Sequence, residues 1–451
     1  MNREIFREYD IRGVAERDLT DPVVRDIGRA FGSRLARGGK KNITLGRDCR
    51  LSSDRLRDAI LAGLQEAGIC VTDIGVVPTP VLYYSIYRWN TDGGVMITGS
   101  HNPSEYNGFK LCDGREALHG PEIQEIARTI EERNYESGAG SVVLKDLLSD
   151  YKQVLAKGFK LPRSVKVVAD CGNGTASLAA VEVMERIGCE VIPLFSEMDG
   201  RFPNHHPNPT SEENLKDLVR TVLEKKAEVG VAFDGDSDRI GVVNERGEII
   251  WGDELLILYA RNILGKIPGA TIIGEVKCSQ NLYDDVARRG GNAIMWRTGH
   301  SLIKAKMVQE GAVVAGEMSG HMFFADRYYG YDDAIYAACR LMEILSETGE
   351  PLSALLADVP KTHSTPEIRV QTEDSKKFEI VKAATEYFSS LYATITVDGV
   401  RVLFEEGAWG LIRASNTEPV LVLRFEARSA ERLQEVRRIV EVKLAEIMKR
   451  G

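Results

Sequence analysis

The chain has 451 residues, which is too long for one ordinary hydrophobic core and predicts three or four domains. Its composition is globular, with 43% hydrophobic and 28% charged residues, and no apolar run reaches the ~18 residues of a membrane span, so no membrane association is expected. The net charge of −9 argues against general nucleic-acid binding, but it does not exclude a small anionic ligand, because a local cluster of Arg and Lys suffices.

The N-terminal residues 1–6 lack the apolar core of a signal peptide. The seven cysteines are scattered, are odd in number and form no CxxC pair, so we expect a reduced, cytoplasmic protein without structural zinc. No heptad pattern or sticky helix demands an oligomer, and we therefore expect a monomer.

Three stretches of the chain share one pattern of strand, polar loop, helix, glycine and strand. The polar loop of the first copy is 47–53, and the helices are predicted to end at Gly68, Gly188 and Gly290. The strands predicted in the three copies are 42–46 and 69–71, 165–169 and 189–192, and 270–274 and 292–295. Such strand–helix–strand units imply a parallel or mixed sheet covered by helices. Similar units also occur in α/β proteins without a true sequence repeat.

Each copy is followed by one more apolar strand that ends in a loop of unusual chemistry. Strands 93–97, 229–233 and 311–315 lead into the sequences TGSHNP, DGDSDR and GEMSGH. Ligands of open α/β sheets gather beyond the carboxyl ends of strands, so these loops are placed to line one cleft between three domains. This matching placement favours a true triplication.

The last part of the chain follows a different pattern. A strand at 410–412, a polar loop at 413–419, a strand at 420–425 and an amphipathic helix at 430–449 predict a smaller α+β domain, joined near 359–366. The predicted fold is three repeated mixed-sheet α/β domains plus this C-terminal α+β domain around a central cleft. The expected domains are 1–145, 146–250, 251–362 and 363–451.

The acidic loop carries Asp234, Asp236 and Asp238, whose carboxylates repel one another unless a cation joins them. A hard divalent cation such as Mg²⁺ suits three converging carboxylates and leaves positions for phosphate oxygens. An EF-hand is the competing interpretation, with Glu245 at its twelfth position. However, Arg239 replaces the glycine at its sixth position, and strands flank the loop. A solvated acidic turn remains an alternative.

Two further loops offer groups that bind phosphate and sugar. The run Arg413-Ala-Ser415-Asn416-Thr417 supplies a guanidinium, hydroxyls and an amide that suit a phosphate, although a plain hairpin turn has a similar composition. The run containing Glu317, Ser319 and His321 pairs donors with acceptors, as sugar hydroxyls require, although a structural loop is an equal alternative.

Ser100 lies beside His101, but the pair does not predict hydrolase chemistry. Adjacent side chains usually point apart, and the G-x-S-x-G elbow is absent. A phosphoserine explains the site better, because a phosphate on Ser100 can bind the metal of the acidic loop and be passed to a hydroxyl. Lys110 or a nearby histidine would handle the proton, and His101 would hold the phosphate or its loop.

With these four motifs in this order, the chain resembles the α-D-phosphohexomutases over essentially its whole length. The runs Tyr9–Gly13 (YDIRG) and Phe202–Pro207 (FPNHHP) are similar to the bacterial phosphomannomutase/phosphoglucomutase branch. Gly99 and Met318 point the same way, because phosphoglucosamine relatives usually have Ala and Gln there. Ser237 departs from the glycine of many relatives and is expected to face away from the metal.

The resemblance implies a role for each matching residue. Ser100 carries the phosphoryl group and joins Asp234, Asp236 and Asp238 in holding Mg²⁺. Sugar hydroxyls contact Glu317, Ser319 and His321, and the phosphate that is not transferred contacts Arg413, Ser415, Asn416 and Thr417. The other matching active-site positions are Tyr9, Arg12, His101, Lys110, Arg239, Lys277 and His300, of which Lys110 and His300 are the acid/base candidates.

The implied activity is reversible interconversion of hexose 1-phosphate and hexose 6-phosphate, with mannose or glucose as the sugar. The expected cofactors are Mg²⁺ and a hexose 1,6-bisphosphate, which acts as activator and intermediate. Phosphoglucosamine mutase is the alternative enzyme. A phosphate-binding sensor and a phosphatase that uses Ser100 are the alternatives of other classes.

Overall fold

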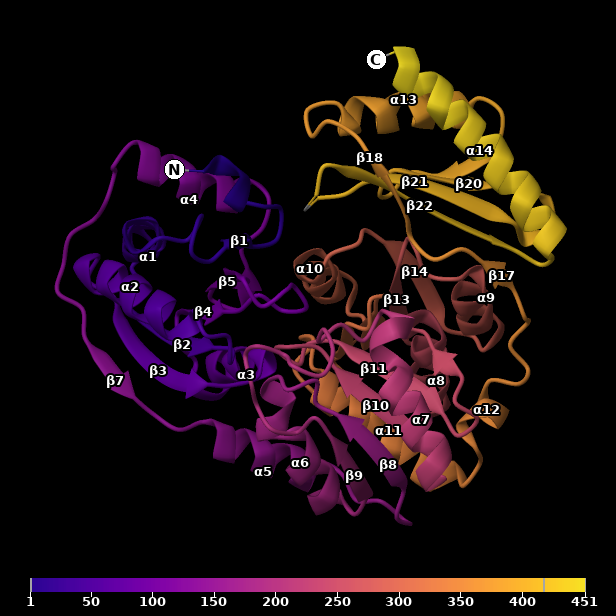
Figure 1. Ribbon diagram of the computed structural model, residues 1–451, viewed down its shortest axis with the longest axis horizontal. Coiled ribbons are helices and arrows are strands. Elements are labelled where there is room, and N and C mark those ends of the chain that lie inside the picture. The colour runs from indigo at the N-terminus through magenta and orange to yellow at the C-terminus, as the bar shows by residue number, and fades with distance from the viewer. Residues whose placement is uncertain (1, 417, 451) are drawn as a thin grey trace.

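Four β-sheets organise the computed structural model, which describes residues 2–416 and 418–450. Each sheet and its helices form one domain, and the domains follow one another along the chain (Figure 1). The predicted fold class, three α/β domains and a smaller C-terminal α+β domain, is confirmed.

Domain 1 has a seven-stranded sheet in the order β1-β5-β4-β2-β3-β7, with β6 paired to β5. Its elements are β1 (Ile11–Val14), α1 (Asp21–Arg37), β2 (Asn42–Arg47), α2 (Ser53–Glu66), β3 (Cys70–Val76), α3 (Thr79–Trp89), β4 (Gly93–Ile97), β5 (Tyr106–Asp113), β6 (Glu116–Ala117), α4 (Pro121–Glu131) and β7 (Val142–Leu144).

Domains 2 and 3 have sheets ordered β12-β11-β10-β8-β9 and β14-β13-β15-β16. The elements of domain 2 are α5 (Leu148–Gly158), β8 (Lys166–Asp170), α6 (Ala180–Ile187), β9 (Glu190–Leu194), α7 (Lys216–Lys225), β10 (Val229–Phe233), β11 (Ile240–Asn244) and β12 (Ile249–Ile250). Those of domain 3 are α8 (Gly252–Lys266), β13 (Thr271–Glu275), α9 (Gln280–Arg288), β14 (Asn292–Trp296), α10 (His300–Glu310), β15 (Val314–Gly316), β16 (Met322–Phe324), α11 (Ala334–Thr348) and α12 (Leu352–Leu355).

The three sheets share one arrangement, which confirms the predicted triplication. In each, the first strand of the repeat pairs in parallel with the second and third, and the third pairs antiparallel with a fourth. The third strands are β4, β10 and β15, and the three unusual loops connect them to β5, β11 and β16. The predicted helix-ending glycines, Gly68, Gly188 and Gly290, have positive φ angles of 84°, 110° and 75°.

Domain 4 has an antiparallel sheet, β17-β22-β21-β20-β19, with β18 paired to β22 and two helices on one face. Its elements are β17 (His363–Ser364), β18 (Ile368–Gln371), α13 (Lys377–Ser389), β19 (Ala393–Ile395), β20 (Val400–Leu403), β21 (Trp409–Ala414), β22 (Val420–Ala427) and α14 (Ala430–Arg450). Arg413, expected to begin a loop, is part of β21, because it pairs with Val422 of β22.

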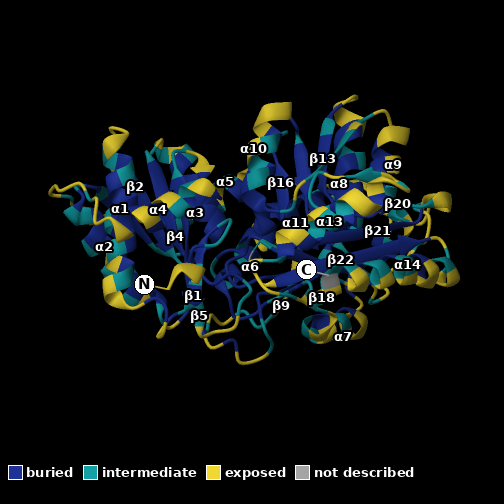
Figure 2. Cartoon of the chain, turned by 90° about the horizontal axis from the view of Figure 1, so that it is seen from above, coloured by how far each residue is buried: buried dark blue, intermediate teal, exposed yellow. Residues whose placement is uncertain are grey.

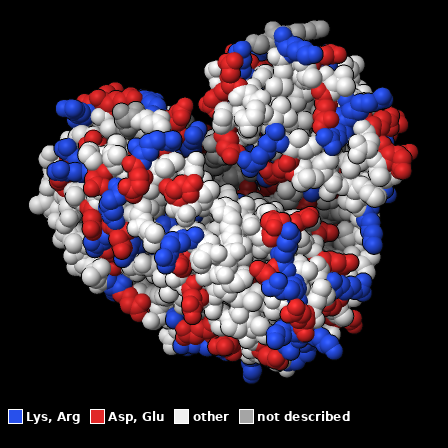
Figure 3. All heavy atoms as spheres, viewed as in Figure 1, with Lys and Arg blue, Asp and Glu red and all other residues white. Residues whose placement is uncertain are grey.

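The cores separate domain 4 from the rest of the molecule. One continuous hydrophobic cluster runs from α3 of domain 1 through domain 2 into domain 3, whereas domain 4 packs around a cluster of its own. The sheets lie in the buried interior, and exposed residues line the outer helix faces (Figure 2). Figure 3 shows a deep notch between domain 1 and domain 4, with charged side chains on its rim.

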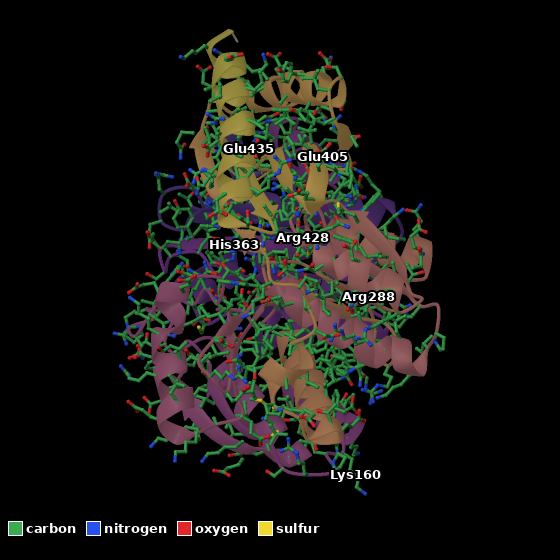
Figure 4. All side chains as sticks on the ribbon, turned by 90° about the vertical axis from the view of Figure 1, so that its right-hand side faces the viewer. Lys160, Arg288, His363, Glu405, Arg428 and Glu435 are labelled. Carbon is green, nitrogen blue, oxygen red and sulfur yellow. The ribbon has the colours of Figure 1, made fainter. Side chains whose placement is uncertain are left out.

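Domain 4 lies above domains 3 and 2 when the molecule is seen from its right-hand side (Figure 4). The labelled His363, Glu405 and Glu435 lie on domain 4, and Lys160 lies at the opposite end. Among the helices of the described residues, none combines the length and apolarity that a membrane crossing needs.

Asp333 joins domain 2 to domain 3 and is 1% exposed. Its carboxylate caps α11 by accepting a hydrogen bond from the Tyr336 amide at 2.9 Å. The hydroxyls of Tyr151 from α5 and Tyr328 also donate to it, at 3.0 and 2.8 Å. One carboxylate therefore satisfies a helix N-terminus, the hydroxyl of the buried Tyr151 and the hydroxyl of the half-buried Tyr328.

We predict that Asp333→Ala lowers the free energy of unfolding by about 3 kcal/mol, because it removes the cap and leaves the hydroxyls of Tyr151 and Tyr328 without this acceptor. Ser279→Ala is the matched control, because it removes only the cap at Asn281, worth about 1 kcal/mol. Urea unfolding followed by circular dichroism measures both values. Equal losses in the two variants would show that the tyrosine hydroxyls do not depend on Asp333.

Candidate active site

Two loops meet where β4 and β10 end. The serine loop, residues 98–106, carries Ser100, and the acidic loop, residues 234–239, carries the three aspartates. Ser100 Oγ donates a hydrogen bond to Asp234 Oδ2 at 2.9 Å, and His101 Nδ1 lies 3.1 Å from the same hydroxyl. Ser100 is 2% exposed, and its φ angle of 47° places it in the left-handed region, where few non-glycine residues occur. The hydroxyl therefore faces the acidic loop from a strained backbone position.

The three carboxylates of the acidic loop converge, as the sequence predicts. Asp234, Asp236 and Asp238 are fully buried, and their oxygens lie within 4.8 Å of one another. Burial, together with the Asp238 and Asp236 carboxylates, raises the pKa of Asp234 well above its ordinary value. Ser237 has a positive φ of 65°, and its hydroxyl turns to Thr175 at 3.0 Å.

Lys110 of β5 lies among these carboxylates. Its ammonium is hydrogen-bonded to Asp238 and lies 3.2 Å from Asp236 Oδ2. Burial alone would lower the pKa of Lys110, but the Asp236 and Asp238 carboxylates outweigh it and raise that pKa above its ordinary value. Lys110 is therefore a charged group at neutral pH.

The acidic loop fits a hard divalent cation. Within the described part of the chain, Asp236 Oδ1 and Asp238 Oδ1 are buried and accept no hydrogen bond. Buried carboxylate oxygens in this condition are the ligands that Mg²⁺ prefers. The loop is not an EF-hand, because strands β10 and β11 flank it and Glu245 binds Ser353 instead.

His321 is held on both sides of its ring. Arg239 Nε donates to His321 Nε2 at 3.0 Å, and His321 Nδ1 lies 3.1 Å from both Asp332 Oδ2 and the Asp238 carbonyl oxygen. These contacts assign the proton of the neutral ring to Nδ1 and the lone pair to Nε2. Asp332 also pairs with Lys304 at 3.0 Å.

His300 begins α10 beside this group. Within the described residues, 2–416 and 418–450, its Nδ1 has no hydrogen-bond partner. The same atom lies 4.0 Å from Asp332 Oδ2. Burial and the nearby Lys304 ammonium lower the pKa of His300 well below its ordinary value, so the ring is neutral. The ring centroids of His300 and His321 are 5.7 Å apart.

Tyr9 connects domain 1 with domains 3 and 4. Its hydroxyl donates to the Thr298 carbonyl oxygen at 2.7 Å and accepts a hydrogen bond from Asn416. Its ring lies so close to Gly299 that a Cβ there would meet it at 2.5 Å, so this position requires glycine. Glu317 accepts a hydrogen bond from the Gly299 amide at 2.8 Å.

In domain 4, Arg413 and Ser415 are both 5% exposed at the end of β21. Arg413 Nε donates to Asp398 Oδ2 at 2.9 Å. Ser415 Oγ accepts a hydrogen bond from the Glu418 amide at 3.2 Å. Thr417, a predicted phosphate ligand, lies outside the described residues.

The remaining predicted residues lie around the same loops. Lys277 Nζ donates to Glu367 Oε1 at 2.6 Å, near the start of domain 4. Arg12 donates to the Asn102 side chain at 2.7 Å in the serine loop. Ser319 is half-buried on the Glu317–His321 turn. The predicted residues of domains 1, 2 and 3 thus belong to one assembly, which Tyr9 links to domain 4.

Several site residues are not predicted from the sequence. Thr79 begins α3 and donates to Asp236 Oδ2 at 2.5 Å. Asp332, Glu367 and Asp398 are ion-pair partners of the predicted His321, Lys277 and Arg413, and Lys304 pairs with Asp332. None of these five residues lies in an unusual loop. The only sequence signal of the four ionisable ones was a charge in an otherwise plain segment, and Thr79 gave no signal at all.

Comparison with known proteins identifies four family models along the chain. The phosphoglucomutase/phosphomannomutase models match alpha/beta/alpha domain I at residues 3–137, domain II at 144–247, domain III at 251–363 and the C-terminal domain at 367–441. A phosphomannomutase/phosphoglucomutase of Pseudomonas putida is 47% identical over 98% of this chain and 96% of its own. A phosphoglucomutase of Neisseria gonorrhoeae is 44% identical over 97% of this chain and 95% of its own.

A solved structure has the same fold at comparable identity. The phosphoglucomutase/phosphomannomutase family protein of Burkholderia thailandensis has a TM-score of 0.92 and 42% identity, and the match covers 99% of this chain and 98% of that one.

We predict that Asp238→Asn weakens binding of Mg²⁺ or Mn²⁺ at least about tenfold, because one carboxylate of the convergent set loses its charge. Isothermal titration calorimetry of the metal-stripped protein measures the affinity. Glu245→Gln is the control, because that carboxylate follows the same loop but binds Ser353, and it should leave the affinity unchanged. If Glu245→Gln weakened metal binding and Asp238→Asn did not, the metal would bind elsewhere than at the three aspartates.

Proposed function

The chain belongs to the phosphoglucomutase/phosphomannomutase family, and we propose that it interconverts hexose 1-phosphates and hexose 6-phosphates through a phosphoserine at Ser100. The observation that carries this proposal is the buried Ser100 hydroxyl bonded to Asp234 of the cation-binding loop. Phosphoglucosamine mutase is not favoured, because the curated relatives at 44–47% identity are named for glucose or mannose.

The proposed reaction has two transfers. First, the bond between Ser100 Oγ and phosphorus breaks, and a bond forms from phosphorus to the free O6 of a hexose 1-phosphate or to O1 of a 6-phosphate. The hydroxyl proton leaves, and a hexose 1,6-bisphosphate results. The bisphosphate then turns round and returns its other phosphoryl group to Ser100 Oγ, which regenerates the phosphoenzyme.

We propose that Asp234, Asp236 and Asp238 hold Mg²⁺ together with the phosphoserine. When bound, this cation supplies positive charge that offsets the negative charge developing on the phosphoryl oxygens. Lys110 and Arg239 contribute fixed positive charge from the adjacent β5 and acidic loop. His101 adds a nitrogen 3.1 Å from Ser100 Oγ that helps to orient the carrier.

We propose that an imidazole, rather than Lys110, accepts the proton of the attacking hydroxyl. Lys110 is held charged between two carboxylates, whereas His300 and His321 are placed as neutral rings. Both nitrogens of His321 are engaged, Nδ1 by Asp332 and Nε2 by Arg239, whereas His300 Nδ1 has no hydrogen-bond partner among the described residues and is available for a proton, so we propose His300 as this base. The same ring returns a proton to the leaving oxygen in the reverse direction.

The remaining residues are proposed to bind the sugar. Glu317, Ser319 and His321 contact ring hydroxyls, and Tyr9 and Arg12 close the site from domain 1. The phosphate that is not being transferred binds Lys277, Arg413, Ser415, Asn416 and Thr417. Mannose and glucose differ only at C2, and a site that accepts a sugar in two orientations discriminates weakly there, so we propose that both are substrates.

We propose a cytoplasmic location, which the seven free thiols support, and we propose that the protein is a monomer. All seven lie in described residues, and none forms a disulfide there. The proposed domain limits are 1–145, 146–250, 251–362 and 363–451. No nucleic-acid or membrane partner is proposed.

We predict that Ser100→Ala prevents phosphorylation by glucose 1,6-bisphosphate and lowers kcat roughly a thousandfold or more, because it removes the phosphoryl carrier. Intact mass measures the first effect as loss of a shift of about 80 Da, one phosphoryl group. Ser85→Ala, at another buried serine, is the control and should behave as wild type. Release of phosphate in every wild-type cycle would instead identify a phosphatase, and binding without isomer exchange a sensor.

We predict that Arg413→Ala raises KM for glucose 1-phosphate by about 10- to 100-fold and changes kcat less, because a charged hydrogen bond to the distal phosphate is lost. Steady-state kinetics separates the two constants. Arg437→Ala on α14, whose partner is Glu441, should change neither. An unchanged KM in Arg413→Ala would remove that residue from the phosphate site.

A further inference from the structure

Arg50 is a fully buried arginine that the reaction as described does not use. It lies in the polar connection between β2 and α2, and its side chain is 0% exposed. No sugar or phosphate group has been assigned to it. Its surroundings are the serine loop on one side and the Phe202 ring of domain 2, 5.1 Å from the guanidinium carbon, on the other.

The guanidinium uses all five of its N–H donors. Four go to main-chain carbonyl oxygens of the serine loop: Ser100 at 2.8 Å, Asn102 at 2.6 Å, Tyr106 at 3.0 Å and Pro103. The fifth, Nε, donates to Asp48 Oδ2 at 3.1 Å. One planar guanidinium therefore binds several main-chain carbonyls of the segment that follows β4, including the carbonyl of Ser100 itself.

Asp48 anchors both partners of this arrangement. It is 1% exposed, and its Oδ2 also accepts the Gly99 amide at 3.1 Å. Its Oδ1 accepts the Arg50 amide at 3.0 Å and the Ser53 hydroxyl at 2.6 Å. The pair thus binds the loop through the amide before Ser100 and through the carbonyls from Ser100 onward.

The serine loop needs such a support because its backbone is strained. Ser100 has a φ of 47°, which a non-glycine residue keeps only where surrounding contacts enforce it. The guanidinium lies so close that a Cβ on Gly99 would meet Arg50 Nε at 2.5 Å. Asp48 binds the amide of Gly99, just before the strained Ser100, and Arg50 binds the carbonyls of Ser100 itself and of Asn102 after it.

We propose that Arg50, anchored by Asp48, is the positioning residue that holds the Ser100 backbone in its strained conformation, so that Oγ faces Asp234 in both phosphoryl transfers. The inference rests on the proposed function of Ser100. Small displacements of a reacting group cost large factors in rate, whereas the proposed sugar-binding residues Glu317, Ser319 and His321 lie on a different loop, in domain 3. Loss of the clamp should therefore reduce transfer rates and leave sugar binding intact.

The test compares Arg50→Lys with Arg340→Lys. Lysine keeps the charge of Arg50 but cannot reach four carbonyls and Asp48 at once. Arg340 is another buried arginine, 1% exposed on α11 and paired with Asp326, so its replacement measures the cost of a buried guanidinium away from the site. The readouts are kcat and KM for glucose 1-phosphate, and the single-turnover rate from phosphoenzyme to bisphosphate.

We expect Arg50→Lys to lower kcat and the single-turnover rate by about 10- to 100-fold with KM within about twofold of wild type. Arg340→Lys should lower the thermal midpoint and leave both rates unchanged per folded molecule. Rates of Arg50→Lys within about twofold of wild type would overturn the proposal, as would equal rate losses in the two variants.

Asp48→Asn decides the question if Arg50→Lys does not fold. It keeps the side-chain volume and weakens the anchor, so we expect about a tenfold loss in the transfer rate with KM unchanged. An unchanged rate in folded Asp48→Asn overturns the proposal. Wild-type protein without isomer exchange would overturn the proposed function instead, so the two failures are distinguishable.

Discussion

Three carboxylates buried on one short loop are the constraint on which the rest of the site depends. With Asp332, four carboxylates lie in this region, whereas the permanent cations beside them are Lys110, Lys304 and Arg239. The four negative charges exceed the three positive ones, and burial together with the neighbouring Asp238 and Asp236 carboxylates raises the pKa of Asp234 well above its ordinary value. A divalent cation relieves the same excess of negative charge. Besides Arg239 of the acidic loop itself, the compensating cations are Lys110 of domain 1 and Lys304 of domain 3, so the acidic loop of domain 2 depends on both neighbouring domains.

The same requirement explains how the domains are joined. Domain 1 has a core of its own, but its α3 region, domain 2 and domain 3 share one continuous apolar cluster, which keeps the charged loops in fixed positions. Domain 4 has a core of its own and meets domain 3 through a small apolar cluster of Val276, Trp409 and Leu411 and through hydrogen bonds from Arg401 to the carbonyls of Val276 and Cys278. A domain with a core of its own can shift as a rigid body relative to the rest of the molecule. The acidic loop and the cations beside it stay in place.

Local sequence patterns predict the elements and the loops of this protein, but they do not predict the partners of the loops. The triplicated fold follows from repeated apolar runs, and Asp234, Asp236 and Asp238 follow from spacing alone. Arg50 lies in the predicted polar loop 47–53, yet its role depends on carbonyls about fifty residues away that only the folded chain brings near. Asp332 is likewise a single acidic residue in a plain segment until His321 and Lys304 pack against it.

The two cations that we propose as ligands of the distal phosphate, Lys277 and Arg413, are already ion-paired within the protein. Lys277 bonds Glu367, and that ammonium lowers the pKa of Glu367 to about 2, while Arg413 bonds Asp398. Each pair is nearly neutral, so a phosphate gains less there than it would from an unpaired cation. In the reaction that we propose, a bisphosphate intermediate must be held at one end and then released so that it can turn. Moderated attraction at the distal phosphate suits that cycle better than maximal affinity, because tight binding would slow the turn without favouring either transfer.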